Sequence, residues 1–433
     1  MRYRSINSRL FELNRKRFSR EMKPNSIALF YSNDLQPRNG DQFYPFRQNS
    51  DLLYLSGLDQ EETILVIFPD CPREDFREVA FIKRTDKYTE TWEGLKYSIE
   101  EAQRISGIKK IYWLSDMEKI LHELILQAQR IYINGNENER LHSPVPSRDR
   151  RNSVVLRDRY PFHKYHRSQP VLKRLRMIKS AEEIELISTS AKITGGAFVQ
   201  LLGYIKPDLI EYEIEAEMIR YFISKGATGP AFEPIVASGP NACILHYTKN
   251  NRVCKEGDLI LLDFGAEYAN YASDLSRTIP VNGKFDKRQR AVYDSVVKLY
   301  HRAVEMMVPG NTLEELNKET AKIAEGELLS LGLIGSGELD RQDPDKPLYK
   351  KFFLHGISHH LGLDVHDLSD RFAPLQSGMI LTCEPGIYIS EEGIGIRVEN
   401  DILITDHGPV NLMRDIPLEA EEIESLMHEN ILT

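Results

Sequence analysis

Short apolar segments alternate with amphipathic segments in the first third of the chain. SIALFYS, ETILVIFP and VAFIKR are each apolar and bounded by turn residues, a pattern that predicts buried strands. DMEKILHELILQAQR has apolar residues at helical spacing, and the short strand-like segment IYING follows it. Because strands and helices alternate here, we expect an α/β domain with a mixed or parallel sheet.

A basic, proline-containing segment interrupts these patterns near residues 143–172. Residues 147–176 are rich in arginine and lysine, their charges are mixed, and no regular hydrophobic period is visible. We interpret this segment as a solvated linker. The sequence therefore predicts an N-terminal α/β domain over residues 1–170 and a second domain over residues 171–433.

The second domain has a different pattern. SAEEIELISTSAKITGGAFVQLL begins with Ser180 and Glu183 at capping-box spacing and continues as an amphipathic helix. DLIEYEIEAEMIRYFISKG repeats this pattern and ends at Gly226, a suitable helix C-cap. Strand-like segments joined by short turns follow, namely LILLDFGAEYANYASDLSRTIPV, MILTCEPGIYI and GIGIRVENDILIT. Helices separated from antiparallel strands indicate an α+β domain.

Length, charge and cysteine content argue against several classes of protein. The 433 residues suggest more than one domain, and the net charge of −9 argues against broad binding to nucleic acid or to anionic membranes. No apolar run approaches the roughly 18 residues needed to span a bilayer. The N-terminus has no apolar core of the kind found in secretory signals. The four cysteines are scattered, as expected for thiols of a reducing cytoplasm: Cys71, Cys243, Cys254 and Cys383.

Acidic residues interrupt or end the apolar strands of the second domain. Asp263 follows four aliphatic residues, Asp274 lies on the expected returning strand of a hairpin, and Glu384 ends another apolar run. Alternation places Arg397 and Glu399 on one face of their segment. A buried carboxylate costs several kcal/mol unless it is paired or binds a metal.

A single acid of this kind usually caps a turn or meets an arginine, and Arg397 could simply neutralise Glu399. One arginine cannot balance four buried acids, whereas two divalent cations can. Carboxylate oxygens suit hard ions such as Mn²⁺, and imidazole ligands extend the choice to Co²⁺ or Zn²⁺. Such a pair of metals, roughly 3.5–4 Å apart, would activate a nucleophilic water.

The nitrogen ligand is expected from FFLHGISHHLGLDVHD, residues 352–367, which holds four of the 12 histidines. Gly356 and Gly362 argue against one regular helix, so His355 and His359 need not form a helical metal-binding pair.

Five of these residues, in this order and in these motifs, resemble the dimetal site of the pita-bread metallopeptidases: Asp263, Asp274, His359, Glu384 and Glu399. That family comprises methionine aminopeptidases, prolidases and aminopeptidase P. The segment YPFRQNSDLLYLSGLDQEE, residues 44–62, is similar to the N-terminal domain of aminopeptidase P, which methionine aminopeptidases lack. The resemblance implies a pita-bread (creatinase/aminopeptidase-like) fold for the second domain.

The resemblance also implies roles for individual residues. The five ligands would hold two divalent metal ions, with Mn²⁺ expected and Co²⁺ or Zn²⁺ as alternatives, and Glu384 would also accept a proton during attack by a hydroxide held between the metals. His355 and His366 fall where the family stabilises the substrate carbonyl and the tetrahedral intermediate, and His246 matches a further histidine near the substrate. Arg397 and Tyr388 match residues associated with proton transfer around that solvent.

The activity implied is that of an Xaa-Pro aminopeptidase, a metallo-exopeptidase that releases the N-terminal residue from peptides with proline in the second position. The family also implies a homodimer or homotetramer. Trp92 resembles a tryptophan that a neighbouring subunit contributes to the pocket, although it could instead be an ordinary packed aromatic residue. The alternatives are a prolidase, which accepts only dipeptides, a non-catalytic pita-bread protein that binds peptides or proteins, and a metal-free creatinase-like relative; the retained acids argue against the last two.

Overall fold

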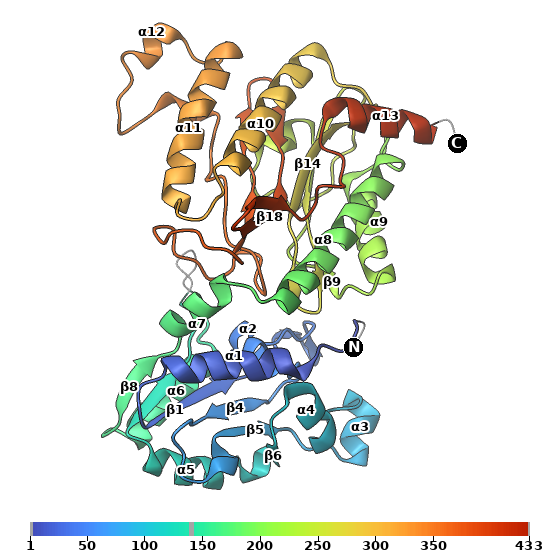
Figure 1. Cartoon of the computed structure of the whole chain (residues 1–433). Helices are drawn as coiled ribbons and strands as arrows, with labels where there is room; N and C mark the ends of the chain where they lie inside the picture. The colour runs from blue at the N-terminus through green and yellow to red at the C-terminus, as the bar shows by residue number, and fades with distance from the viewer. Residues whose placement is uncertain (1–2, 138–142, 432–433) are drawn as a thin grey trace. The chain divides into compact units, whose positions relative to one another are not determined.

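The structure, a computed structural model, describes residues 3–137 and 143–431 and divides into two compact units (Figure 1). One unit is formed by Arg4–Arg176, and the other by Met177–Thr433 with Met1–Tyr3. The division falls after Arg176, whereas the sequence placed it after residue 170. Within the described residues, the structure has no helix long and apolar enough to cross a membrane.

The N-terminal unit is built on one six-stranded sheet in the order β6-β5-β4-β1-β7-β8. Strand β1 is antiparallel to β4, and β4 to β5, while the pairs β5–β6, β1–β7 and β7–β8 are parallel. The expected mixed sheet is confirmed. The strands are β1 (Ser26–Tyr31), β4 (Ile64–Ile67), β5 (Glu78–Ile82), β6 (Lys110–Trp113), β7 (Arg130–Ile133) and β8 (Lys164–Arg167).

Helices cover both faces of this sheet. All six residues of β1 are buried, so its alternating side chains supply two apolar faces. On one face, Phe30 packs edge-on against Phe18 of α1 (Ser8–Glu21), with ring centroids 5.4 Å apart. On the other face, Leu29 belongs to a buried cluster that includes Leu124 of α5 (Met117–Gln127).

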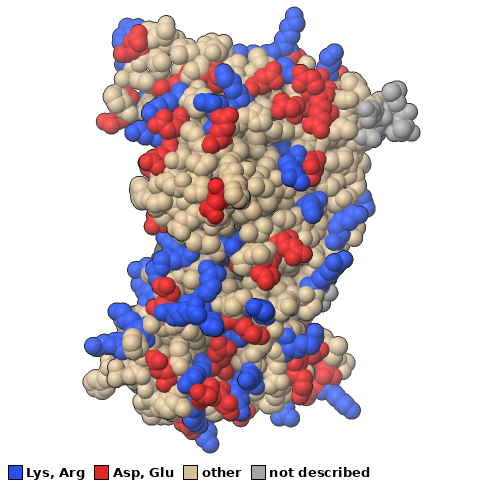
Figure 2. All heavy atoms as spheres, viewed as in Figure 1, with Lys and Arg blue, Asp and Glu red and all other residues tan. Residues whose placement is uncertain are grey.

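The interpretation of residues 147–176 as a linker is wrong. This segment forms α6 (Arg148–Arg159), the edge strand β8 and most of α7 (Gln169–Met177). A few apolar side chains, Leu156 and Leu172 among them, reach the core, while many of the basic residues lie at the surface. Arg151, for example, contacts Asp34, and acidic and basic side chains are interspersed on the face shown in Figure 2. The segment has so many charged residues that its few apolar positions showed no recognisable helix or strand period.

The C-terminal unit places long helices around antiparallel strands, which confirms the α+β expectation (Figure 1). The Ser180–Glu183 capping box begins α8, and α9 ends at Ser224, two residues before Gly226 with its φ of 87°. The long helices are α8 (Ala181–Leu202), α9 (Glu211–Ser224), α10 (Lys287–Glu305), α11 (Leu313–Ser330) and α13 (Ala420–Ile431).

Three small sheets carry the residues of interest. The first has the order β10-β11-β14, with β10 (Ile235–Ser238), β11 (Leu259–Phe264) and β14 (Leu275–Pro280). The second pairs β15 (Ile380–Cys383), β18 (Asn400–Thr405) and β19 (Gly408–Asn411), and the third pairs β16 (Gly386–Ile389) with β17 (Ile394–Arg397). The segment GIGIRVENDILIT is therefore two strands of different sheets, and Val398 and Glu399 lie at the break between them.

Candidate metal centre

The two aspartates come from neighbouring antiparallel strands. Asp263 lies in β11 and is paired with Ser276 of β14, while Asp274 directly precedes β14. Because side chains alternate along a strand, Asp274 and Ser276 face the same side. The hairpin expected from the sequence therefore brings both carboxylates into one space.

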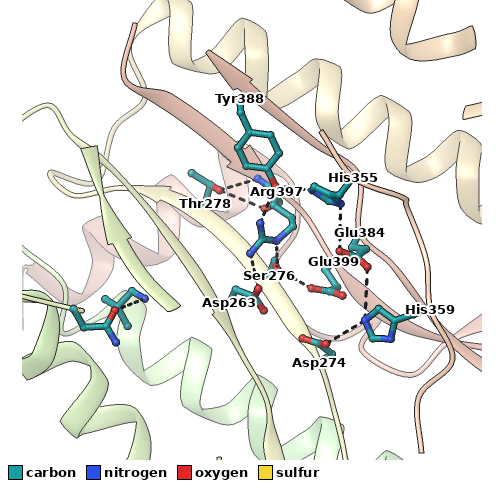
Figure 3. A network of polar contacts seen from close by, with 12 residues as sticks. Asp263, Asp274, Ser276, Thr278, His355, His359, Glu384, Tyr388, Arg397 and Glu399 are labelled. Atoms are coloured by element: carbon teal, nitrogen blue, oxygen red, sulfur yellow. Dashed lines mark hydrogen bonds and ion pairs between the residues drawn. The ribbon is translucent and has the colours of Figure 1, made fainter. Parts of the chain in front are cut away.

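The two glutamates lie at strand ends that the surrounding backbone holds in place. The Glu384 amide donates to the Ile357 carbonyl at 2.8 Å, and the Glu399 amide donates to the Ser276 carbonyl at 3.0 Å. Figure 3 shows the side chains of Glu384 and Glu399 directed toward those of the aspartates. All four acids predicted from the sequence are thus brought together.

His359 completes this set from a segment without helix or strand. Its amide donates to Thr382 Oγ1 at 3.1 Å and its carbonyl accepts from the Thr382 amide at 2.9 Å, which attaches the segment to β15. His359 Nε2 lies 3.6 Å from Asp274 Oδ2 and 3.6 Å from Glu384 Oε1 (Figure 3). The expectation that no single helix spans residues 352–367 is confirmed.

The electrostatics of this cluster favour bound cations. Donor atoms of Asp274, His359 and Glu399 all lie within 4.8 Å of one another, and all three residues are buried. Burial and the neighbouring Glu399 and Asp263 carboxylates raise the pKa of Asp274 well above its ordinary value. Burial and Glu384 do the same to the pKa of Glu399. The ionised form of both groups is therefore unfavourable unless a cation is close to it.

Several buried oxygens of the cluster have no hydrogen-bond partner. These are Asp263 Oδ1, Asp274 Oδ1 and Glu399 Oε1. Unpaired buried carboxylate oxygens are costly, but they are the ligands that hard divalent cations prefer. The donor set of five carboxylate and imidazole residues therefore fits divalent metal ions, as expected from the sequence.

Arg397 contacts the carboxylate of one of these acids, whereas Arg277 reaches only the backbone carbonyl of Glu399. Arg397 forms a buried ion pair with Asp263, and its Nε donates to Ser276 Oγ at 2.9 Å. The Ser276 hydroxyl in turn donates to Glu399 Oε2 at 2.7 Å. One guanidinium thus partly balances two acids and leaves the others to a cation.

Arg397 also begins a chain of hydrogen bonds to His355. Its Nη1 lies 2.7 Å from the Tyr388 hydroxyl, which lies 2.7 Å from His355 Nε2 (Figure 3). His355 Nδ1 is 2.8 Å from the Gly356 carbonyl, which can only accept, so Nδ1 carries the proton. Nε2 of the neutral ring is then an acceptor, and the Tyr388 hydroxyl donates to it.

The surroundings keep Tyr388 and His355 neutral. Burial, together with the positive charge of Arg397, lowers the pKa of His355 to about 4. Burial raises the pKa of Tyr388 to about 12. His355 Nδ1 also lies 3.5 Å from Glu384 Oε2. Since His355 is neutral near pH 7, this is a polar contact of an imidazole N–H rather than an ion pair.

The remaining histidines differ in their relation to the cluster. The ring of His366 stands edge-on to that of His359, with centroids 4.4 Å apart, so His366 adjoins the site. His246 is exposed, and its neighbour Tyr247 packs in a buried cluster with Tyr388. His360 is 1% exposed and pairs through its backbone with Leu381. His360 is therefore packed inside the protein and does not face solvent.

Three polar residues of the site were not predicted from the sequence. Ser276 links Arg397 to Glu399, and Thr278 Oγ1 accepts from the Arg397 amide at 3.1 Å. Asp401 is fully buried and accepts from the Asp274 amide at 3.3 Å. Spacing could have found them, because Ser276 and Thr278 follow Asp274 by two and four residues along β14, and Asp401 follows Glu399 by two.

Trp92, in the N-terminal unit, is not a packed aromatic residue. It lies in α3 (Lys87–Glu93), its side chain is 73% exposed, and its nearest ring contact is Tyr88 at 6.1 Å between centroids. That alternative interpretation of Trp92 is therefore wrong.

Comparison with known proteins agrees with the geometry of both units. Residues 185–406 match metallopeptidase family M24, and residues 11–132 match the aminopeptidase P N-terminal domain. The Xaa-Pro aminopeptidase of Haemophilus influenzae is 35% identical over 96% of this chain and 97% of its own length. That of Escherichia coli is 34% identical over 98% of each chain.

Solved structures give the same result. Escherichia coli aminopeptidase P with the inhibitor Pro-Leu superposes with a TM-score of 0.88 at 33% identity, covering 99% of this chain and 100% of that one. Pseudomonas aeruginosa aminopeptidase PepP superposes with a TM-score of 0.89 at 32% identity, with the same coverage. The acid and histidine cluster, the fold and the matches over nearly the whole length together place this chain in metallopeptidase family M24, in its branch with an aminopeptidase P N-terminal domain.

Proposed function

We propose that this protein is an Xaa-Pro aminopeptidase, which hydrolyses the bond between the first residue of a peptide and a following proline. The observation that carries the proposal is the convergence of Asp263, Asp274, His359, Glu384 and Glu399 beside the Arg397–Tyr388–His355 chain. The full-length similarity to enzymes named Xaa-Pro aminopeptidase supports the same substrate class.

The cluster would hold two divalent metal ions, and Mn²⁺ is the metal we propose. Bound there, they would supply a nucleophilic water and polarise the scissile carbonyl. Titrating metal-free protein with Mn²⁺ should raise its thermal transition, because ligands that bind only the folded state stabilise it. Asp274→Asn should lose most of this shift, and an unchanged shift in that variant would contradict the site.

Each residue of the site has its own role in the proposed reaction. Glu384 accepts the proton of the attacking water, and its contact with His355 Nδ1 orients the carboxylate. His366, whose ring adjoins that of His359, would donate to the developing oxyanion, and His246 would donate to the substrate. Arg397 and Tyr388 would take part in proton transfer around the attacking water, and His355, which contacts Tyr388, would stabilise the substrate carbonyl and the tetrahedral intermediate.

This arrangement suits a prolyl bond. Proline has no N–H, so a peptidase that grips the scissile amide hydrogen loses that contact. Attack on the carbonyl carbon does not require it, although the prolyl nitrogen must be protonated as it leaves. Glu384, after accepting a proton from the attacking water, would donate it to this nitrogen.

We propose that the enzyme works as a cytoplasmic homodimer or homotetramer. All four cysteines are free, which suits a reducing compartment. The exposed pair Tyr88 and Trp92 on α3 would be covered by another subunit.

The test offers purified Mn²⁺-loaded protein three substrate classes: Xaa-Pro dipeptides, Xaa-Pro-Xaa tripeptides and Xaa-Ala tripeptides. We expect cleavage of the tripeptides that contain proline in second position and little cleavage of the alanine series. Cleavage of dipeptides alone would indicate a prolidase instead. Failure to cleave any prolyl substrate with metal bound would exclude both activities.

A further inference from the structure

One buried carboxylate outside the metal centre collects five hydrogen bonds. Glu211 lies in the first turn of α9 and is fully buried. Its Oε1 accepts from the Ser238 amide at 2.7 Å, from Ser238 Oγ at 2.7 Å and from Asn241 Nδ2 at 3.3 Å. Its Oε2 accepts from the Tyr247 hydroxyl at 2.7 Å and from the Arg252 amide at 2.8 Å.

These partners belong to one segment, residues 238–252, and include both of its ends. The segment leaves β10 at Ser238 and returns at Arg252, whose Nη1 also donates to Ser238 Oγ at 2.8 Å. One turn farther along α9, Glu215 accepts from Asn250 Nδ2 at 2.9 Å. The segment is thus closed onto α9, with Glu211 as its main anchor.

His246 lies in the middle of this segment, next to one of the anchored residues. Tyr247 is 7% exposed and packs in a small apolar cluster with Leu261 and Tyr388, while His246 is exposed. Tyr388 is the residue whose hydroxyl contacts His355, so the cluster that holds Tyr247 adjoins the hydrogen-bonded residues of the site. Holding the Tyr247 side chain inward therefore sets where its neighbour His246 lies at the site.

We propose that Glu211 is a positioning residue for His246. Its carboxylate holds the 238–252 segment closed, so that Tyr247 is anchored inside and His246 is presented to the substrate. The proposal rests on the proposed function, because it takes His246 as a residue that meets the substrate. No group of the metal centre is among the partners of Glu211 in the described residues.

A carboxylate is needed at this position because the partners are donors. The Arg252 amide and the Ser238 amide cannot accept, and they approach different oxygens of Glu211. Glutamine has a single acceptor oxygen, so one of these amides would face an NH₂ group. Glu211→Gln therefore loosens one end of the segment while changing the side-chain volume little.

The matched control is Glu213→Gln. Glu213 lies in the same helical turn and accepts from the Ile210 amide at 2.7 Å, an N-terminal capping contact that glutamine also makes. Among the described residues, its side chain forms no hydrogen bond or ion pair with residues 238–252. We expect Glu213→Gln to keep kcat/KM within about two-fold of wild type.

The decisive experiment is a double-mutant cycle of Glu211→Gln and His246→Ala, measured as kcat and KM on an Xaa-Pro-Xaa peptide. Glu211→Gln should lower kcat/KM by roughly ten- to a hundred-fold, since misplacing a substrate-contacting group by about 1 Å costs on that order. In the His246→Ala background the same change should cost less than about two-fold. Equal losses in both backgrounds, or no loss from His246→Ala, would overturn the proposal.

Further measurements show whether a lost activity comes from unfolding, from loss of metal or from an incorrect proposed function. Mn²⁺ content and the thermal transition identify a variant that has merely unfolded or lost metal. Tyr247→Phe serves if Glu211→Gln does not fold; it removes the hydroxyl bond to Glu211 and should give a smaller loss that also disappears with His246→Ala. A wild-type protein that cleaves no prolyl peptide would instead contradict the proposed function.

Discussion

Nη1 of Arg397 lies 2.7 Å from the Tyr388 hydroxyl, deep in the C-terminal unit. The other terminal nitrogen of the same guanidinium contacts Asp263, so one side chain joins the acid cluster to the neutral pair Tyr388 and His355. Removal of the hydroxyl would break this connection without removing an acid of the cluster.

Tyr388→Phe should therefore lower kcat about ten-fold or more while the bound metal is retained. The change leaves Arg397 Nη1 without its acceptor and His355 Nε2 without its donor, so the hydrogen-bonded connection between the acids and His355 is lost. Steady-state kinetics and metal analysis test this. Tyr293→Phe is the matched control, because the hydroxyl of Tyr293 is buried in the same unit and donates to the Leu418 carbonyl at 2.7 Å. Equal kcat in the two variants would remove Tyr388 from the mechanism.

Glu384→Ala should abolish measurable turnover. The substitution deletes an expected ligand 3.6 Å from His359 Nε2 and the proton acceptor in the same step. Glu391→Ala, which removes an exposed glutamate seven residues away along the chain, should leave activity unchanged. Near-normal turnover in Glu384→Ala would contradict the assigned role.

His360→Ala should keep metal and most activity but lose stability. The side chain of His360 is 1% exposed, so truncation leaves a void and costs roughly 1–3 kcal/mol in the free energy of unfolding. His359→Ala should show the opposite pattern, with metal affinity and turnover lost. Metal content, kcat and thermal unfolding of the two neighbours distinguish a packing histidine from a ligand.

The N-terminal unit should lose stability as pH rises from about 4 to 7. Burial raises the pKa of Asp149 to about 7, with the negative charge of Asp51 adding to this and the Tyr31 amide, Asn134 and Arg148 opposing it. The unfolded carboxyl titrates near pH 4, so in this window the folded state binds the proton more tightly and stability falls by up to about 1.4 kcal/mol per pH unit.

Asp149→Asn should flatten this dependence. Both tryptophans, Trp92 and Trp113, lie in the N-terminal unit, so tryptophan fluorescence of the full chain reports its unfolding. Urea titrations of wild type and Asp149→Asn at pH 5 and 7.5 provide the comparison. If the stability of the wild-type unit rises between pH 5 and pH 7.5, and rises as much as that of the variant, the role assigned to Asp149 is contradicted.

The sequence, with the family resemblance that it carries, predicted the five ligands and the class of each domain. A carboxylate at the end of an apolar strand is visible in the sequence because burial of charge is costly wherever the strand lies. Strand and helix periods were likewise local, so α5, α8, α9 and the β11–β14 hairpin were predicted close to where they occur.

The burial of residues 147–176 and the contacts between residues distant in the sequence depended on the tertiary structure. Residues 147–176 look like a linker because their charges outnumber their apolar positions, but Leu156 and Leu172 are buried once a sheet and helices surround them. The break of GIGIRVENDILIT into β17 and β18 places Glu399 beside Ser276, a partner 123 residues away in the chain. Glu211 appears in the sequence as an ordinary residue of an amphipathic helix. Its five donors lie 27 to 41 residues farther along the chain and meet it only after folding, because hydrogen bonds between such distant groups depend on the packing of whole elements.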